Sequence, residues 1–75
     1  MIVIGEIAVS DTNKTVVSLD EYKGRKRLDI RDWFKKDNMK EWVRTKRGVC
    51  INITSVSNLV SLLEKAEDAI LRRQA

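Results

Sequence analysis

Residues 25–34 read RKRLDIRDWF, and this stretch is the most informative in the chain. It holds four cations, two carboxylates and two aromatic rings, with Leu28 and Ile30 as its only aliphatic residues. Alternation of apolar and charged residues is typical of a strand with two different faces. Guanidinium groups beside aromatic rings on one such face indicate a binding surface for a ligand that carries both negative charge and planar rings.

The chain is expected to be a single small domain over residues 1–75. Domains of this size bury little apolar surface and usually need a disulfide, a metal or a second subunit. Cys50 is the single cysteine and histidine is absent, which excludes an internal disulfide and leaves a zinc site few ligands. Oligomerisation is the remaining means of stabilisation, and we expect neither a metal nor a cofactor.

The N-terminal segment is apolar but short. It reads MIVIGEIAV, lacks a basic leader and is interrupted by Glu6, so we expect no signal peptide. No stretch approaches the roughly 18 apolar residues of a membrane span. We therefore expect an intracellular, cytoplasmic protein that has no membrane partner.

Positive charge is concentrated in the middle of the chain. Residues 1–22 carry one Lys against four acidic residues, a net charge of −3, and residues 48–75 are neutral. Residues 23–47 carry eleven Lys and Arg against four acidic residues, a net charge of +7. All four aromatic residues lie in or beside this basic block: Tyr22, Trp33, Phe34 and Trp42. This coincidence of rings and cations is the main functional signal in the sequence.

Four strands are predicted in the first two thirds of the chain. They cover residues 2–9, 15–22, 27–34 and about 42–53. Gly5 marks a bulge, residues 10–14 form a turn, and Gly24 lies in a hairpin connection. Residues 35–41 are polar and form a longer loop.

The alternation of residues sorts the strands into two faces. One face is aliphatic and is expected to form the core: Val17, Leu19, Leu28, Ile30, Val49, Ile51 and Ile53. The other is expected to face outward with cations among aromatic rings: Tyr22, Arg27, Asp29, Arg31, Trp33, Trp42, Arg44 and Lys46. Phe34 has the phase of the core, so it is either buried or turned outward by a bulge.

A helix is predicted over residues 54–73, capped by Asn52 or Thr54, with Arg72 and Arg73 at its negative end. Its apolar residues cover roughly 200° of the helix surface, more than the roughly 100° stripe that packing on one sheet requires. We therefore expect a two-fold homodimer through the helices. The predicted interface residues are Leu59, Leu62, Leu63, Ala66 and Ile70.

The succession of YKGRK, LDIRDWF and KRGVCI followed by an amphipathic helix resembles the transcriptional coactivator family called positive cofactor four. The match covers residues 15–71. The resemblance implies an α+β fold with a curved, four-stranded antiparallel sheet and one C-terminal helix, dimeric through the helices. It also implies binding of single-stranded DNA across the sheet with little sequence preference. The loop sequence KKDNMKEWVRT departs from the acidic, Gly- and Pro-containing loop of the family, and the Ser-rich tail of eukaryotic members is absent, which suggests a bacterial or viral source.

The expected function is therefore sequence-independent binding of single-stranded DNA in transcription, replication or recombination. RNA, melted duplex and replication or transcription proteins are further expected partners. The contact residues that the resemblance implies are Tyr22, Lys23, Lys26, Arg31, Phe34, Lys46 and Arg47. The basic and aromatic pattern adds Arg25, Arg27, Trp33, Lys35, Trp42 and Arg44. Trp42 could instead pack in the dimer interface.

Two other classes of function are a protein-interaction module and an enzyme. A protein-interaction module that docks an acidic partner is the main alternative. An enzyme is disfavoured because no histidine is present to act as a general base. Asp29 and Asp32 are expected to pair with neighbouring arginines across strands and not to bind a metal. Cys50 is expected to be a small buried or half-buried residue.

Overall fold

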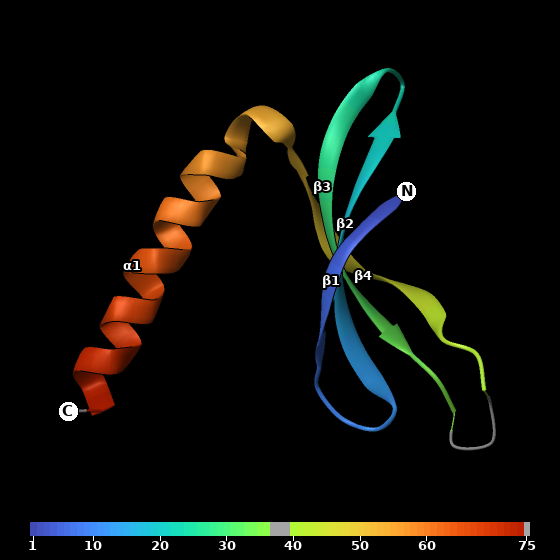
Figure 1. Cartoon of the computed structure of the whole chain (residues 1–75), viewed down its shortest axis with the longest axis horizontal. Coiled ribbons are helices and arrows are strands. Elements are labelled where there is room, and N and C mark those ends of the chain that lie inside the picture. Colours follow the sequence, from blue (N-terminus) through green and yellow to red (C-terminus); the bar gives the residue numbers. More distant parts are fainter. Residues whose placement is uncertain (37–39, 75) are drawn as a thin grey trace.

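The computed structural model describes residues 1–36 and 40–74. These residues form an antiparallel sheet with strand order β1-β2-β3-β4, followed by a short 3-10 turn and one long helix (Figure 1). The elements are β1 (Ile2–Ala8), β2 (Asn13–Tyr22), β3 (Arg25–Phe34), β4 (Val43–Asn52), η1 (Ile53–Ser55) and α1 (Val56–Gln74). The predicted α+β fold of four antiparallel strands and a C-terminal helix is confirmed. Of the loop predicted at residues 35–41, residues 37–39 lie outside the described part.

A two-residue turn joins β2 to β3. Lys23 and Gly24 have φ angles of 52° and 77°, and Tyr22 pairs with Arg25 across the turn. Positive φ at both central residues defines a type I′ turn, whose twist matches that of the flanking strands. Because the turn uses only two residues, β3 begins two residues earlier than predicted.

The edge strand β1 is joined to β2 by a connection that is also tighter than predicted. The amides of Val9 and Ser10 both donate to the carbonyl oxygen of Asn13, at 3.0 Å, so the ladder of β2 already begins at Asn13. Within β1 the register shifts between Val3 and Gly5, which confirms the predicted bulge at Gly5.

A wide bulge interrupts the pairing of β3 with β4. Arg44 and Gly48 pair with β3 residues that are only two apart, so three residues of β4 lie opposite Asp32 alone. The hydroxyl of Thr45 donates to the carbonyl oxygen of Asp32 (2.7 Å) and accepts from the amide of Arg47 (3.1 Å). These hydrogen bonds satisfy backbone groups that the bulge removes from the ladder.

Gly48 allows β4 to approach β3 at the end of this bulge. A Cβ at this position would lie 2.9 Å from the Cα of Arg31 and closer still to the carbonyl oxygen of Ile30. No such contact is possible for an L side chain without a backbone shift, so glycine is required here by packing.

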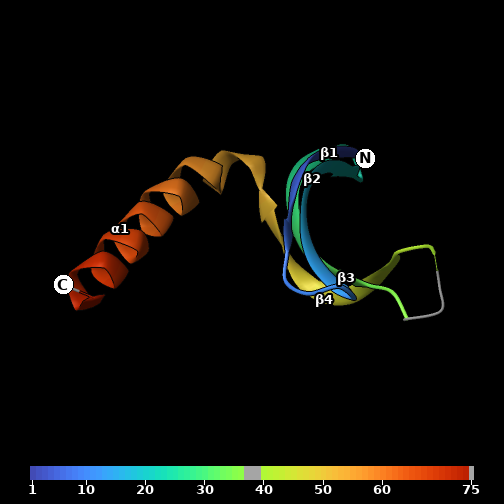
Figure 2. The same ribbon diagram turned by 60° about the horizontal axis from the view of Figure 1, so that its bottom comes forward.

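Burial within one chain contradicts the predicted core. Among the described residues, the buried ones are Val16 (4% exposed), Ser18 and Asp29 (1% each), and the cross-strand register places all three on the face that carries the cations. None of the predicted core residues is fully buried: Val49 and Ile53 are 55% and 45% exposed, and the other five are half-buried. The sheet is strongly curved (Figure 2), and its curvature brings the side chains of the inner face together.

The register defines the two faces for the rest of the structure. The inner face of the sheet carries Lys14, Val16, Ser18 and Asp20 of β2 and Arg27, Asp29, Arg31 and Trp33 of β3. The aliphatic face carries Val17, Leu19, Leu28, Ile30, Val49 and Ile51.

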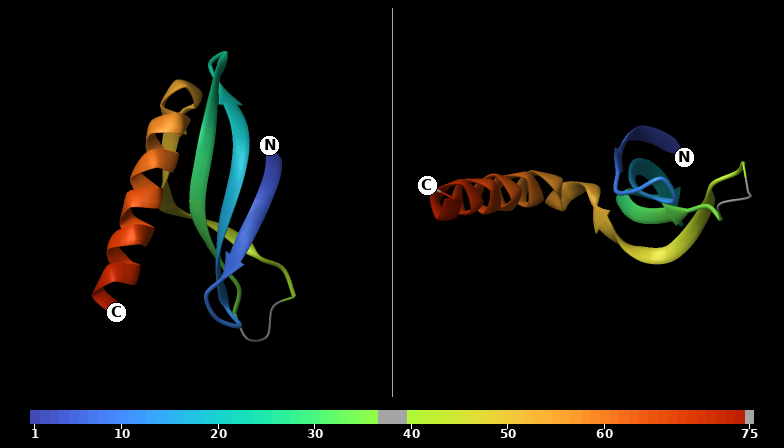
Figure 3. Two further views of the ribbon diagram at one scale, coloured as in Figure 1. Left: turned by 60° about the vertical axis from the view of Figure 1, so that its left-hand side comes forward. Right: turned by 90° about the horizontal axis from the view of Figure 1, so that it is seen from below.

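Helix α1 extends away from the sheet (Figures 1 and 3). Asn52 caps η1, because its side-chain oxygen accepts from the amide of Thr54 at 3.1 Å, and Arg72 pairs with Asp68 one turn earlier in α1. Among the described elements, α1 packs mainly against η1. The helix therefore leaves the aliphatic face of the sheet uncovered. No helix in residues 1–36 and 40–74 has the length and apolar composition needed to cross a membrane.

A single chain is more extended than a compact domain of its length. The radius of gyration is 14.8 Å, against about 11 Å for a compact chain of this size. The accessible surface is 6392 Å², against about 4,700 Å² for a folded monomer of this mass. The chain therefore exposes about 1,700 Å² more surface than a stable monomer of its mass does.

Candidate nucleic-acid interface

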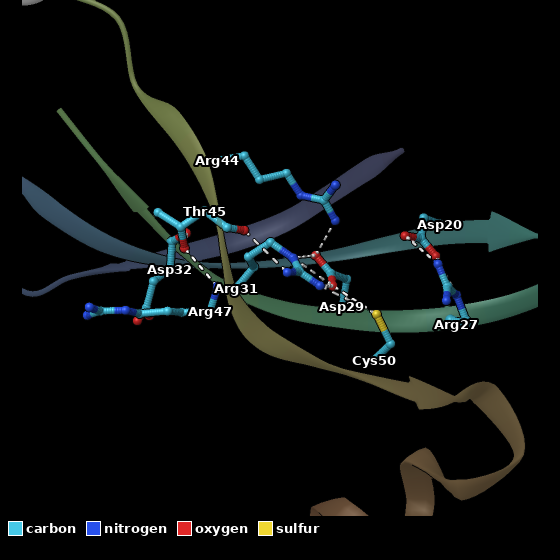
Figure 4. Close-up of polar contacts among 9 residues, drawn as sticks. All are labelled: Asp20, Arg27, Asp29, Arg31, Asp32, Arg44, Thr45, Arg47 and Cys50. Atoms are coloured by element: carbon cyan, nitrogen blue, oxygen red, sulfur yellow. Dashed lines mark hydrogen bonds and ion pairs between the residues drawn. The ribbon is translucent and has the colours of Figure 1, made fainter.

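An ion cluster around Asp29 organises the centre of the inner face (Figure 4). The carboxylate of Asp29 accepts from Nη2 of Arg31 at 2.8 Å, from Nε of Arg31 at 3.2 Å and from Nη2 of Arg44 at 3.0 Å. The Arg31 hydrogen bonds hold the pKa of Asp29 well below its usual range, with Cys50 and Arg44 also lowering it and burial opposing them. The carboxylate in turn raises the pKa of Arg31. A buried carboxylate with this many donors is a structural anion that fixes both arginines.

The predictions for the acidic residues and Cys50 are confirmed in part. Asp29 pairs with arginines as expected, whereas Asp32 hydrogen-bonds the hydroxyl of Thr15 at 3.2 Å. Cys50 is exposed, not buried or half-buried, because its strand is at the edge of the sheet; its thiol donates to Asp29 at 3.2 Å. In the described part of the chain, no group of three or more Cys, Asp or Glu side chains is placed to hold a metal ion.

Two tryptophans and two lysines form a cluster at the end of the inner face near the β3–β4 connection. The Nζ of Lys14 lies 4.5 Å from the ring centroid of Trp42 and 5.9 Å from that of Trp33. The Nζ of Lys35 lies 5.0 Å from the Trp42 ring. Both indoles are half-buried, and cation–π contacts of this length orient the rings on the sheet. Trp42 therefore belongs to the inner face of its own chain.

At the opposite end of the inner face, Tyr22 presents the most exposed of the four aromatic rings. Tyr22 is 55% exposed, and the guanidinium carbon of Arg27 lies 4.8 Å from the ring centroid. Arg27 is held in this position by Asp20, with Nε 3.2 Å from the carboxylate (Figure 4). The Nζ of Lys23 also lies 5.3 Å from the ring centroid, so Tyr22 combines an exposed ring with two cations beside the type I′ turn.

Several cations of the basic block form no ion pair with an acidic residue in the described part of the chain. Among residues 1–36 and 40–74, ion pairs involve Lys14, Arg27, Arg31, Arg44 and Arg72. The predicted contact cations that form none with a described residue are Lys23, Arg25, Lys26, Lys35, Lys46 and Arg47. These side chains are available to an anionic ligand.

The structure places the predicted contact residues on both faces of the sheet. Those on the inner face, by register or by contact with it, are Tyr22, Arg25, Arg27, Arg31, Trp33, Lys35, Trp42 and Arg44. Phe34 and Lys26 have the register of the aliphatic face, where Phe34 is half-buried and lines a hollow together with Arg47. Lys23 lies in the turn and Lys46 in the bulge. Of the two alternatives left open for Phe34, its register therefore supports the one in which the ring lies on the aliphatic side of the sheet.

The sequence prediction missed Lys14 as a member of the site. Lys14 is the only cation of residues 1–22, and it contacts both indoles as well as the carboxylate of Glu6, at 2.9 Å. Lys14 lies two residues before Val16 and four before Ser18, which places it on the inner face, but only the extension of β2 to Asn13 brings it into the sheet. The predicted turn over residues 10–14 concealed this signal.

Comparison with known proteins identifies related chains with this architecture. The chain superposes on a PC4 homologue from Burkholderia pseudomallei with a TM-score of 0.78 at 23% identity, covering 87% of this chain and 86% of that one. A second crystal form of that protein gives a TM-score of 0.77 at 25% identity, with 87% and 94% covered. A homologue from bacteriophage T5, described as implicated in recombination-dependent DNA replication, gives a TM-score of 0.57 at 25% identity, with 93% and 78% covered. No curated protein sequence matches this chain.

The sequence itself matches a family model over most of its length. The model is that of Transcriptional Coactivator p15 (PC4), and it covers residues 9–62, from the start of the β1–β2 turn to the second turn of α1. The matched segment contains the type I′ turn, the ion cluster and the aromatic residues described above. The family is a nucleic-acid-binding, non-enzymatic one. On the combined basis of sequence and fold, this chain belongs to the Transcriptional Coactivator p15 (PC4) family.

Proposed function

We propose that this chain is a homodimeric single-stranded-DNA-binding protein that holds unpaired strands with little sequence preference during transcription, replication or recombination. The observation that carries the proposal is the gathering of Tyr22, Trp33 and Trp42 with cations on the inner face of a curved sheet. Binding proteins for unpaired strands combine these two elements, because rings stack on exposed bases and cations follow the phosphates.

The rings differ in the role that their exposure supports. Tyr22 is the most exposed of the rings; a base can stack on it when the Lys23 ammonium, 5.3 Å from the ring centroid, moves aside, and such stacking contributes about 1–3 kcal/mol. Trp42 is half-buried between Lys14 and Lys35, and Trp33 is half-buried beside Lys14, so a base that stacks on either ring would displace a lysine ammonium toward the adjacent phosphate.

The phosphates are assigned to the cations that no described carboxylate neutralises. On the turn and the bulge these are Lys23, Arg25, Lys46 and Arg47, at opposite ends of β3. Arg31 has a different role, because its Nε and Nη2 atoms are already bound to Asp29. We assign Arg31 to the support of the inner face and the free cations to the strand.

A second subunit supports the fold in this proposal. The surplus of about 1,700 Å² of exposed surface is within the range that one subunit of an obligate homodimer buries, about 1,000–2,500 Å². Helix α1 contributes apolar area to this exposed surface, because Leu62, Leu63 and Ile70 are each more than half exposed. The predicted interface residues Leu59 and Ala66 lie on the same helix. A dimer through α1 would cover these side chains.

The test is affinity for single-stranded and double-stranded oligonucleotides of equal length at two salt concentrations. The single strand should bind more tightly at both concentrations, because a duplex offers no exposed base faces for stacking. Tyr22→Ala should weaken single-strand binding by about 1–3 kcal/mol, and Tyr22→Phe, which keeps the ring, should not. Equal affinity for both forms, or binding only to acidic proteins, would reject single-strand binding and favour a protein-interaction module.

A further inference from the structure

A polar hollow lies at the end of the aliphatic face, on the opposite side of the sheet from Trp33. We call it the bulge pocket; it has a volume of about 320 Å³ and is lined mainly by Asn13, Asp32, Phe34, Lys35, Thr45 and Arg47. Three strands and the bulge in β4 create it, and Figure 4 shows Asp32, Thr45 and Arg47 gathered at this bulge. Its size is within the range of small-ligand sites, roughly 300–1,000 Å³.

The lining supplies both elements that a nucleotide requires. Phe34 contributes an aromatic ring, and Arg47 contributes a guanidinium that pairs with no carboxylate in the described part of the chain. Lys35 connects the pocket to the inner face, since it lines the pocket while its Nζ lies 5.0 Å from the Trp42 ring. A strand that follows the inner face can therefore place one nucleotide in the bulge pocket. This step rests on the proposed function.

Asp32 gives the bulge pocket a chemical preference. One carboxylate oxygen of Asp32 accepts from the hydroxyl of Thr15 at 3.2 Å, which orients the group, and the other has no hydrogen-bond partner among the described residues. The hydroxyl of Thr45 is already used twice, as a donor to the Asp32 carbonyl and as an acceptor from the Arg47 amide. The side-chain oxygen of Asn13 is also used, because it accepts from the hydroxyls of Ser10 and Thr12. Among the described lining residues, the free carboxylate oxygen of Asp32 is therefore left as an acceptor that cannot donate.

We propose that the bulge pocket selects a base that carries an exocyclic amino group, so that cytosine is preferred to thymine at this one position of the bound strand. Cytosine presents N4–H₂, a donor that Asp and Glu accept from, where thymine presents the O4 acceptor. A carboxylate facing O4 would meet a second acceptor and lose its hydrogen bond. Binding elsewhere on the strand stays independent of sequence, because stacking and phosphate contacts do not distinguish bases.

The experiment compares the affinities of the full-length protein for oligo(dC) and oligo(dT) of equal length, at mildly alkaline pH where cytosine is unprotonated. Oligo(dC) should bind about fivefold more tightly, the low end of what one base contact contributes. Asp32→Asn should reduce this ratio to about one. Asp11→Asn is the matched control: it removes the same charge from the β1–β2 turn, outside the pocket, and should keep the ratio.

A second measurement needs no variant. Deoxycytidine monophosphate should displace a labelled mixed-sequence strand from the wild-type protein at lower concentration than thymidine monophosphate does. Tight binding of oligo(dC) and oligo(dT) with equal affinity, or a ratio that persists in Asp32→Asn, would overturn the base preference and leave the proposed function intact. Failure of both oligonucleotides to bind would overturn the proposed function and the preference with it.

Discussion

Replacing Lys46 and Arg47 together with glutamine should flatten the salt dependence of single-strand binding, whereas replacing Arg31 should not. Lys46 and Arg47 lie in the bulge of β4 and form no ion pair with a described residue. Each phosphate contact on a single strand contributes about 0.7 to the slope of log K against log salt. About five such contacts from one subunit give a slope near −3.5, and the double variant should reduce its magnitude by about 1.4.

Arg31 should behave differently because its charge is already balanced. Its side chain is nearly buried and donates through Nε and Nη2 to the buried carboxylate of Asp29. Arg31→Met would leave Asp29 with Arg44 and Cys50 as its remaining donors. Removing one partner of a buried ion pair costs about 3–5 kcal/mol of unfolding free energy, and the low end applies here because Arg44 remains. The affinity for the oligonucleotide should then fall only to the extent that part of the protein is unfolded, and the salt slope should be unchanged.

Fluorescence anisotropy of a labelled oligonucleotide over a salt titration measures the slope, and urea unfolding of the same samples measures stability. Arg72→Gln combined with Arg73→Gln is the matched control, since it removes two charges from the exposed end of α1 and should leave the slope as it is. The opposite pattern would contradict these assignments: Arg31→Met reduces the magnitude of the slope by as much as one phosphate contact, while the double variant of Lys46 and Arg47 leaves it unchanged.

Three further variants test the structural elements that support this surface. Gly48→Ala should destabilise the protein by about 1–3 kcal/mol, because the added Cβ would meet the backbone of β3. Gly5→Ala is the control and should have little effect, because its Cβ would meet nothing within 4 Å. Thermal unfolding compares the two variants, and equal shifts in melting temperature would contradict this packing. Leu63→Asp should give monomers or unfolded chains by sedimentation, whereas Ser61→Asp on the polar side of α1 should remain dimeric; a stable Leu63→Asp dimer would mean that the interface lies elsewhere. Because the pKa of Asp29 is lowered in the folded protein, the ionised carboxylate contributes its full stability above the ordinary Asp pKa of about 4, and this contribution is lost as the pH falls below that value. Asp29→Asn should therefore remove part of the acid sensitivity of urea unfolding. An unaltered dependence of stability on pH would argue against this role.

The sequence predicted the architecture because each element carries a strong local signal. Alternation in residues 25–34, the Lys23–Gly24 pair and the periodic apolar residues of α1 are all short-range patterns, and they correctly indicated four antiparallel strands and a helix. The missed boundaries have a common cause. Both connections are tighter than composition suggested, because positive φ at Lys23 and the double hydrogen bond to Asn13 let the strands pair almost to the turns.

The candidate site was predicted in composition but not in geometry. Alternation correctly placed Arg31, Trp33 and Arg44 on one face, but it could not show that curvature buries Asp29 there and commits Arg31 to it. It also could not show that the bulge in β4 would open a pocket around Phe34 on the other face. Curvature and bulges depend on contacts between strands, which a single-sequence pattern does not contain.

We expect an unpaired strand to lie on the inner face of the sheet. The most direct test of this expectation is a titration of isotope-labelled protein with a single-stranded oligonucleotide, followed by the two indole N–H signals and the backbone amides in NMR spectra. We predict that the indoles of Trp33 and Trp42 and the amides of Tyr22 and Arg25 shift together as the strand is added. Shifts confined to α1, with both indole signals unmoved, would contradict the account.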